Sequence, residues 1–381
     1  MRVQKGFVLA LVLWILTALS LIAGFFAAWT QRALEIAQSL QNETQADLDM
    51  YSTQATLMYL FATQRYNLGG LSIPELLEDH NKKKPKKLTE EEMNARLDAA
   101  LKKFIKKQDQ QLDFDEEVIN YDPTGNELAL DDKSYYGFGD VRFAIQDKHG
   151  LLSLGFVDGN NLERLLGLLG VPIEHRQPLV AKFQDYIDFD DLYQVNGAES
   201  RDYKEKALKP PLNRKVRTAE EMQEIIDWKK FPSVWENNVF GQLTNVSAYL
   251  GTPNFNTAPL LVLQSLNGID IGTAQKIITA RKKMPIRNYL ELNEIVGVPL
   301  LYEPEQLAFF ASNQMRLTLW YHGQNKMRQI HFTVMPFAAK GNRPWTVEYV
   351  LDLPLNNSYK NATPIYAKTP VFAATLPTTP R

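Results

Sequence analysis

The chain has 381 residues, with 45% hydrophobic and 23% charged residues, which is typical of a packed globular protein. Its formal net charge of −2 argues against broad electrostatic attraction to nucleic acid or anionic lipid. Because the sequence contains no cysteine, disulfides, thiolate metal sites and cysteine catalysis are excluded.

The chain starts with a short basic leader, and an uncharged apolar run follows it. The leader (1–6) contains Arg2 and Lys5, and no charged residue occurs from Phe7 to Trp29. As a helix with a rise of about 1.5 Å per residue, this run crosses the roughly 30 Å hydrocarbon core of a bilayer. The leader cations predict a cytoplasmic N-terminus and a body across the membrane. The alternative is a cleavable signal peptide, whose apolar region is normally shorter, about 7–15 residues.

A stalk is expected to continue this helix without a break, because the first proline is Pro74. The stalk carries an apolar stripe at three- and four-residue spacing that includes Leu40, Leu48 and Tyr51. We therefore predict one helix over residues 7–66, and we expect contacts to partner proteins along its apolar stripe from Leu40 to Ala62. The alternative is a single-pass anchor followed by an ordinary first helix.

A charge-rich segment follows the stalk. Asn81–Lys87 is a basic loop, and Thr89 with Glu92 forms a capping box that predicts a helix to Lys107. Basic clusters can bind nucleic acid or lipid, but acidic neighbours offset this one. A solvated surface insertion is the preferred interpretation.

The body consists of strand-like runs on either side of a block of short helices. This order predicts an α+β fold, in which the long N-terminal helix packs on an antiparallel sheet and a large all-helical domain is inserted between strands. Strands are predicted at 127–130, 141–145, 316–321, 329–335 and 346–353, and helices at 162–169, 177–189, 218–229, 259–265, 272–282 and 289–294.

The predicted organisation has seven parts. They are the leader (1–6), the transmembrane part (7–29) and the amphipathic part (30–66) of the first helix, the first part of the α+β domain with the charged insertion (67–155), the inserted helical domain (156–311), the C-terminal strands (312–355) and a flexible tail (356–381).

An acidic segment in the helical block predicts a metal site. Asp188 and Asp190 are two residues apart, and Glu199 is at the twelfth position counted from Asp188. A twelve-residue loop with this spacing wraps oxygen ligands around Ca²⁺. It is not an EF-hand, because Tyr193 occupies the place of the turn glycine. We predict structural calcium, and the alternative is a helix end with an acidic surface loop.

A second segment, over 254–283, resembles a helix-hairpin-helix, a non-specific DNA-binding unit. Gly268 fits the start of its phosphate-binding turn, but Asp270 stands where the second glycine belongs and would repel a phosphate. We therefore interpret it as a scaffold without DNA function, although Lys276 and Arg281 leave a membrane-anchored DNA-binding protein as an alternative.

Catalysis is not predicted. The five histidines are scattered, and no phosphate-binding glycine motif or HExxH zinc motif is present. We expect a protein that is not an enzyme.

Gly6 followed directly by Phe7, after a small basic leader, resembles the cleavage site of type IV prepilins and of type II secretion pseudopilins. The resemblance implies cleavage after Gly6 by the prepilin peptidase and methylation of Phe7. In major subunits the fifth mature residue is a glutamate that pairs with a neighbour's N-terminal amine. Here that residue is Leu11, a departure that resembles the minor pseudopilin K and implies a position at the filament tip.

The acidic segment resembles the same family, in the order Tyr186, Asp188, Asp190-Asp191, Gly197-Ala198-Glu199 and Tyr203. The resemblance implies calcium bound by five acids: Asp188, Asp190, Asp191, Glu199 and Asp202.

The resemblance also implies the function and the location. The chain would be a single-pass inner-membrane protein with a periplasmic body that primes and caps the pseudopilus to support protein export across the outer membrane. Its partners would be minor pseudopilins I and J, then H, and the major pseudopilin, with no nucleic acid. A minor subunit of a type IV pilus is a further alternative.

Overall fold

The computed structural model describes residues 6–73, 121–156, 158–247, 251–300, 302–335, 343–367 and 371–372. Most of the leader, the charge-rich segment with its predicted helix, and the last residues of the tail lie outside this description. Everything said below about structure concerns the described residues.

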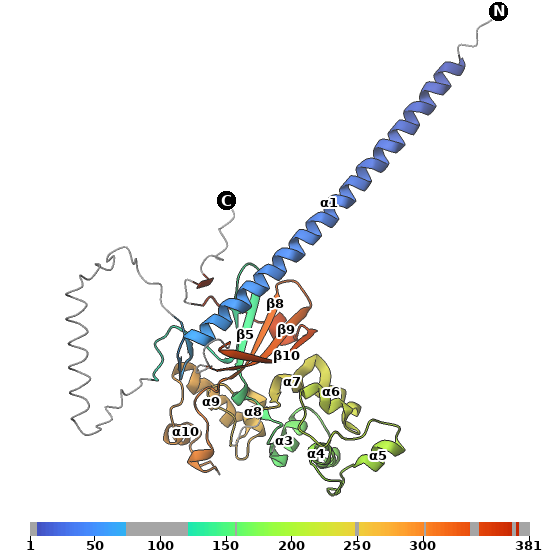
Figure 1. Cartoon of the computed structure of the whole chain (residues 1–381). Coiled ribbons are helices and arrows are strands. Elements are labelled where there is room, and N and C mark those ends of the chain that lie inside the picture. Colours follow the sequence, from blue (N-terminus) through green and yellow to red (C-terminus); the bar gives the residue numbers. More distant parts are fainter. Residues whose placement is uncertain are drawn as a thin grey trace, which may run out of the picture.

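One long helix, α1 (Gly6–Thr63), projects from a compact body, as Figure 1 shows. At about 1.5 Å per residue its 58 residues span roughly 87 Å. The N-terminal part is apolar and exposed, and it is long enough to cross a membrane by length and composition. The continuous helix was predicted correctly, although it ends at Thr63 instead of at the predicted residue 66.

The body contains a five-stranded antiparallel sheet in the order β10-β9-β8-β5-β4. The strands at 141–145, 316–321, 329–335 and 346–353 were predicted to within a few residues. The sheet consists of β4 (Asp131–Tyr136), β5 (Val141–Asp147), β8 (Gln314–Tyr321), β9 (Lys326–Val334) and β10 (Trp345–Pro354).

The described part of the body also contains two smaller sheets. One is antiparallel and contains β1 (Tyr66–Asn67), β2 (Gly70–Ser72) and β3 (Glu127–Leu128). The other pairs β6 (Leu152–Ser153) in parallel with β7 (Thr244–Asn245). Gly70 has a φ of +136°, and a Cβ there would overlap with the Leu128 carbonyl, so this turn requires glycine.

Short helices between β5 and β8 form the inserted helical block (Figure 1). Its α-helices are α3 (Gly159–Leu168), α4 (Ile173–Ile187), α5 (Ser200–Glu205), α6 (Pro232–Trp235), α7 (Val239–Leu243), α8 (Leu260–Ser265), α9 (Ile271–Lys283) and α10 (Tyr289–Val296). Its 3₁₀ turns are η3 (Ala219–Glu224), η4 (Trp228–Lys230) and η5 (Glu236–Asn238), while η2 (Lys148–Gly150) precedes the block and η6 (Pro304–Gln306) follows α10.

One predicted helix of this block is wrong. The segment at 218–229 forms two 3₁₀ turns instead of an α-helix, because Ile225 is extended with a ψ of 138° and Asp227 has a left-handed φ of 72°. The α+β class and the insertion of a helical block between strands are confirmed.

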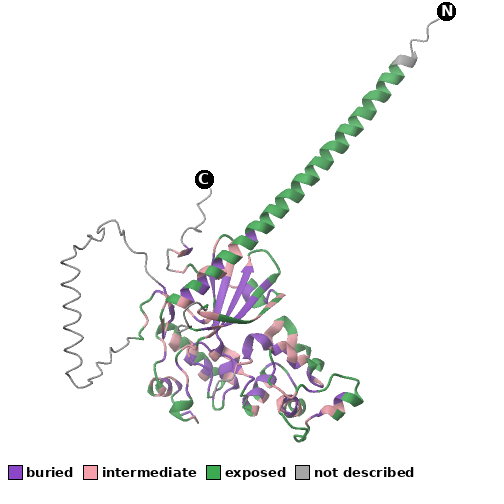
Figure 2. Ribbon diagram, viewed as in Figure 1, coloured by how far each residue is buried: buried purple, intermediate pink, exposed green. Residues whose placement is uncertain are grey.

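Two large apolar cores and a smaller one around Trp320 and Tyr359 hold the described part of the body together, and Figure 2 shows the buried interior beside the exposed stalk. One core lies between α1 and the sheet and includes Leu57, Phe61, Phe143 and Phe332. The other lies within the helical block and includes Trp228. The end of α1 is thus fixed on the sheet by burial.

The C-terminal segment is packed, so the predicted flexible tail is wrong for its described part. Helix α11 (Asn357–Lys360) buries Tyr359, and Ile365 forms a parallel bridge with Tyr135 of β4. Phe372 is buried in the core between α1 and the sheet. Isolated apolar residues in a Pro- and Thr-rich segment are enough to attach it to the sheet edge.

Candidate metal centre

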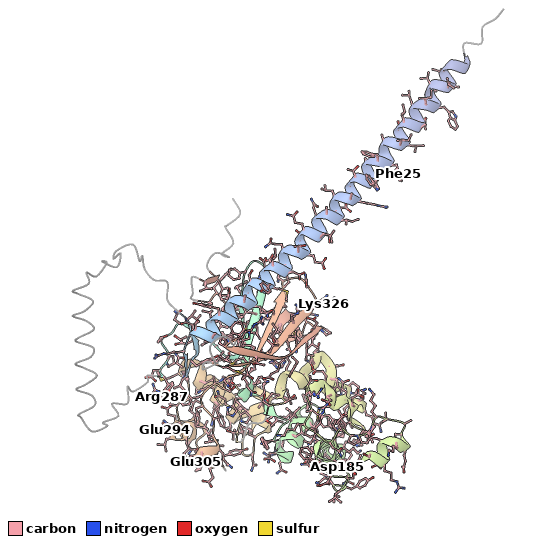
Figure 3. All side chains as sticks on the ribbon, viewed as in Figure 1. Phe25, Asp185, Arg287, Glu294, Glu305 and Lys326 are labelled. Atoms are coloured by element: carbon pink, nitrogen blue, oxygen red, sulfur yellow. The ribbon has the colours of Figure 1, made fainter. Side chains whose placement is uncertain are left out.

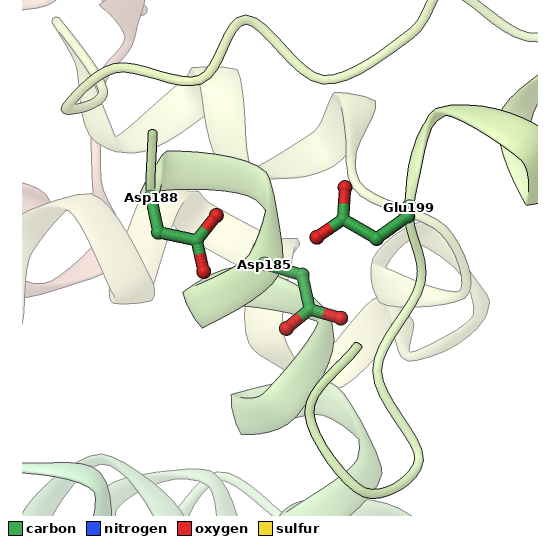
Figure 4. A group of neighbouring side chains, drawn as sticks. All are labelled: Asp185, Asp188 and Glu199. Carbon is green, nitrogen blue, oxygen red and sulfur yellow. The ribbon is translucent and has the colours of Figure 1, made fainter. Parts of the chain in front are cut away.

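Helix α4 and the start of α5 bring three carboxylates together at one end of the helical block (Figures 3 and 4). Asp185 lies in the last turn of α4, and Asp188 is the C-cap of this helix. Residues three apart on a helix lie on the same face. The chain then runs through an exposed loop and returns at Glu199, the N-cap of α5. The site therefore joins the end of one helix to the start of another.

The three carboxylates can each offer an oxygen atom such that all three atoms lie within 4.8 Å of one another. Glu199 is 2% exposed and Asp185 is fully buried. Both carboxylate oxygens of Glu199 and Oδ1 of Asp188 are buried without a hydrogen-bond partner. Buried acceptors without partners are costly, so this group lacks a positively charged or hydrogen-bonding component.

The loop between the helices is built around Asp185. Its Oδ1 accepts a hydrogen bond of 3.0 Å from the backbone N–H of Gln194. A Cβ at Gly197 would overlap with Oδ2 of Asp185. Gly197 is therefore required for the chain to pass close to this carboxylate.

The mutual repulsion of the acids is visible in their pKa values. Burial, and then the charges of Asp185 and Asp188, raise the pKa of Glu199 to about 7. Burial, and then the charge of Asp190, raise the pKa of Asp188 to about 6. Burial also raises the pKa of Asp185. In each case burial is the main cause of the shift, and the neighbouring negative charges add to it.

Of the five predicted ligands, the structure brings Asp188 and Glu199 into the group. Asp190, Asp191 and Asp202 lie outside it: Oδ1 of Asp190 accepts from the Leu192 N–H at 2.8 Å, and Oδ2 of Asp202 accepts from the Glu199 N–H at 2.9 Å. Asp185 was not among the predicted ligands. Its position one helical turn before Asp188 was the signal that could have identified it.

The group fits a hard divalent cation. Calcium prefers six to eight oxygen ligands, many of them carboxylates. The unpartnered oxygens of Glu199 and Asp188 and the glycine that makes room for Asp185 are what such an ion needs. No histidine belongs to the group, which disfavours zinc.

The predicted packing residues of the stalk are all exposed. Leu11, Leu40, Leu48 and Tyr51 are 51%, 59%, 55% and 71% exposed, respectively. At about 100° per residue, Leu40, Leu48 and Tyr51 lie on one face of α1. The cleavage position falls at the beginning of α1, which starts at Gly6.

The segment that resembles a helix-hairpin-helix does not present a free helix N-terminus. Oδ1 of Asp270 caps α9 by accepting from the Thr273 N–H at 2.8 Å. Arg281 is in the last turn of α9, at the opposite end. This arrangement disfavours phosphate binding at the turn.

The segment that contains the three carboxylates is similar to a domain of known proteins. Residues 157–235, which contain all three carboxylates, match the model of a domain described as "Type II secretion system (T2SS), protein K". The fold is similar to a chain in the crystal structure of the GspK-GspI-GspJ complex from the enterotoxigenic Escherichia coli type 2 secretion system. The match covers 57% of this chain and 82% of that chain. The sequence identity is 14% and the TM-score is 0.40. No curated protein matches the chain. Residues 157–235 are thus similar to a domain of the type II secretion protein K family.

Proposed function

We propose that the chain is a minor pseudopilin at the tip of the type II secretion pseudopilus, where it primes assembly and caps the filament to support protein export. The observation that carries this proposal is Leu11, which lies on a continuous apolar helix where major subunits have an acid. A pseudopilin without this acid offers no partner to the N-terminal amine of a neighbour. It therefore suits a position where no such pairing is needed.

The proposed membrane arrangement follows from the same helix. The prepilin peptidase cuts after Gly6, Phe7 becomes the methylated N-terminus, and residues 7–29 hold the chain in the inner membrane. The leader cations keep the N-terminus cytoplasmic, and the body lies in the periplasm.

The proposed contact to minor pseudopilins I and J is the exposed face of α1. The buried face of the same helix, with Thr53, Leu57 and Phe61, packs on the sheet. Leu48 and Tyr51 are 55% and 71% exposed, so their apolar surface is available to pack against the helix of another pseudopilin. Contacts to the minor pseudopilin H and to the major pseudopilin would follow along the stalk.

We further propose that Asp185, Asp188 and Glu199 hold structural calcium. The ion supplies positive charge to three carboxylates that form no ion pair with a described cation, and it fills the unpartnered positions at Asp188 and Glu199. Because these residues lie on α4 and α5, the ion fixes the loop between the two helices. Asp190, Asp191 and Asp202 remain predicted ligands.

The tip proposal is tested by isolating the full chain from membranes together with the minor pseudopilins I and J. We expect Leu48→Glu with Tyr51→Glu to abolish the complex, because a charge in a helix contact loses its hydration. Gln38→Glu with Asn42→Glu adds the same charge at exposed positions off this stripe of α1, so this control should leave the complex intact. An unchanged complex in the first variant contradicts the proposed contact.

Mass analysis of the N-terminus in the same preparation tests the processing. A mature chain that begins with methylated Phe7 is expected. A chain that keeps Met1, or one trimmed near Ala28, contradicts the pseudopilin assignment.

A further inference from the structure

A polar cleft of about 270 Å³ lies at the opposite end of the helical block from the carboxylates, on the side where Arg287 is labelled in Figure 3. Its walls come from the loop at Gly69 and Gly70, from the start of β4, and from the end of α9. Four cations line it: Lys133, Arg281, Lys282 and Lys283. Asp131 is the one acidic residue among its described lining residues.

The cations converge from two separate elements. Lys133 belongs to β4, whereas Lys282 and Lys283 end α9. Lysines are common in the last turn of a helix because they interact favourably with the helix dipole. The dipole of α9, however, does not explain Lys133 on a strand. The ion pairs among the described residues involve other cations, so the three lysines are not neutralised by neighbours within salt-bridge distance.

Arg281 forms a rigid part of the cleft wall. Its Nη1 donates hydrogen bonds of 2.8 Å to the carbonyls of Phe255 and Ala258. These bonds tie α9 to the segment that precedes α8. The guanidinium is thus held in place, while the lysines around it are exposed.

Asp131 decides which kind of anion the cleft suits. Its Oδ1 is buried and has no hydrogen-bond partner. Such an acceptor needs a donor, and a fully ionised phosphate offers none. A peptide offers a backbone N–H to Asp131 and side-chain carboxylates to the lysines.

We propose that this cleft binds an extended acidic segment of a partner protein. The lysines contact the carboxylates of the segment, and Asp131 accepts a hydrogen bond from its backbone. The volume accommodates a few residues of extended chain. This surface is separate from the stalk face and from the carboxylate site, so it provides a third contact region.

The test is a binding titration with the full chain in detergent micelles at roughly 150 mM salt, where long-range attraction is screened. The probe is a labelled octapeptide of alternating glutamate and serine. A peptide with glutamine for glutamate and a single-stranded octanucleotide with the same label are the comparison probes. We expect the acidic peptide to bind about tenfold more tightly than either of them, as two to three charge contacts allow.

The variant Lys282→Gln with Lys283→Gln should weaken binding of the acidic peptide about tenfold. Lys276→Gln with Lys229→Gln removes the same charge at exposed positions outside the cleft and should leave binding within about twofold. An equal loss in both variants would show diffuse attraction and overturn the site. Octanucleotide binding as tight as that of the peptide would overturn the peptide assignment, as would undetectable peptide binding. Thermal unfolding of each variant confirms that it is folded.

Discussion

Like charges cluster at both ends of the helical block, but the two clusters differ in burial and in hydrogen bonding. At the α4–α5 end the carboxylates are largely buried and face one another, and several of their oxygens have no partner. At the α9 end the lysines are exposed, and the half-buried Arg281 is bonded to carbonyl oxygens. Burial, rather than charge count, therefore decides which end needs a ligand in order to be stable. We therefore propose that the acidic end binds an ion, whereas the exposed lysines of the basic end are hydrated when no partner is bound.

The largest expected effect is removal of the ion. An ion present at about 100 times its dissociation constant stabilises the folded state by about 2.7 kcal/mol. Chelation should therefore lower the Tm of the full chain by roughly 5–10 °C, measured by thermal unfolding. Binding of the acidic peptide at the other end should be unchanged in chelator, which would show that the two sites are independent.

Glu199→Gln is the control for this prediction. It removes one buried negative charge and one ligand, so calcium should no longer raise the Tm appreciably. If the unmodified chain unfolds at the same temperature with calcium and with chelator, the acidic end holds no structural ion.

A smaller effect is expected from glycine substitutions at the two ends. Gly197→Ala forces a methyl group into Asp185 and should cost about 1–3 kcal/mol of stability, together with calcium binding. Gly268→Ala, just before α9, meets no neighbour within 4 Å and should cost about 1 kcal/mol through its left-handed φ of 78°. Chemical unfolding of both variants with and without calcium measures the loss of stability and the calcium response of each. Loss of the calcium response in Gly268→Ala would contradict the separation of the two ends.

The smallest expected effect is a pH dependence of the chelated chain. The folded-state pKa of Glu199 is raised from 4.5 to about 7, so between these values the folded state binds more protons than the unfolded state. Stability in chelator should therefore be greatest below about pH 4.5 with respect to this group and fall as pH rises through 7. The slope should flatten in Glu199→Gln, measured by denaturant unfolding from about pH 5 to 8. A chelated chain that becomes more stable with rising pH over this range contradicts the repulsion inferred for the acidic end.

The sequence predicted the parts of the molecule that depend on local pattern. The uncharged run after Phe7 and the absence of proline before Pro74 were sufficient for α1. Alternating apolar residues were sufficient for β8 and β9. The helix predicted over 218–229 is wrong because Ile225 is extended and Asp227 is left-handed, and the sequence pattern gives no sign of either conformation.

The candidate site was only partly predictable for a similar reason. Spacing identified Asp188 and Glu199, because they flank one loop. Asp185 enters the group through the last turn of α4, and the basic cleft exists only because β4 and α9 meet in three dimensions. Lys133 is far from Lys282 in sequence, and no local pattern connects them.

The return of the C-terminal segment to the sheet has a consequence for how the body folds. Phe372 completes a core that includes Phe143, and the Tyr359 hydroxyl donates to Asp132 across a separation of 227 residues. Such distant pairings close large loops, which slows folding because the entropy of closure is lost before the contacts form. The sheet therefore reaches its final form only after nearly all of this polypeptide has been synthesised, long after the apolar helix at its start is available for insertion into a bilayer.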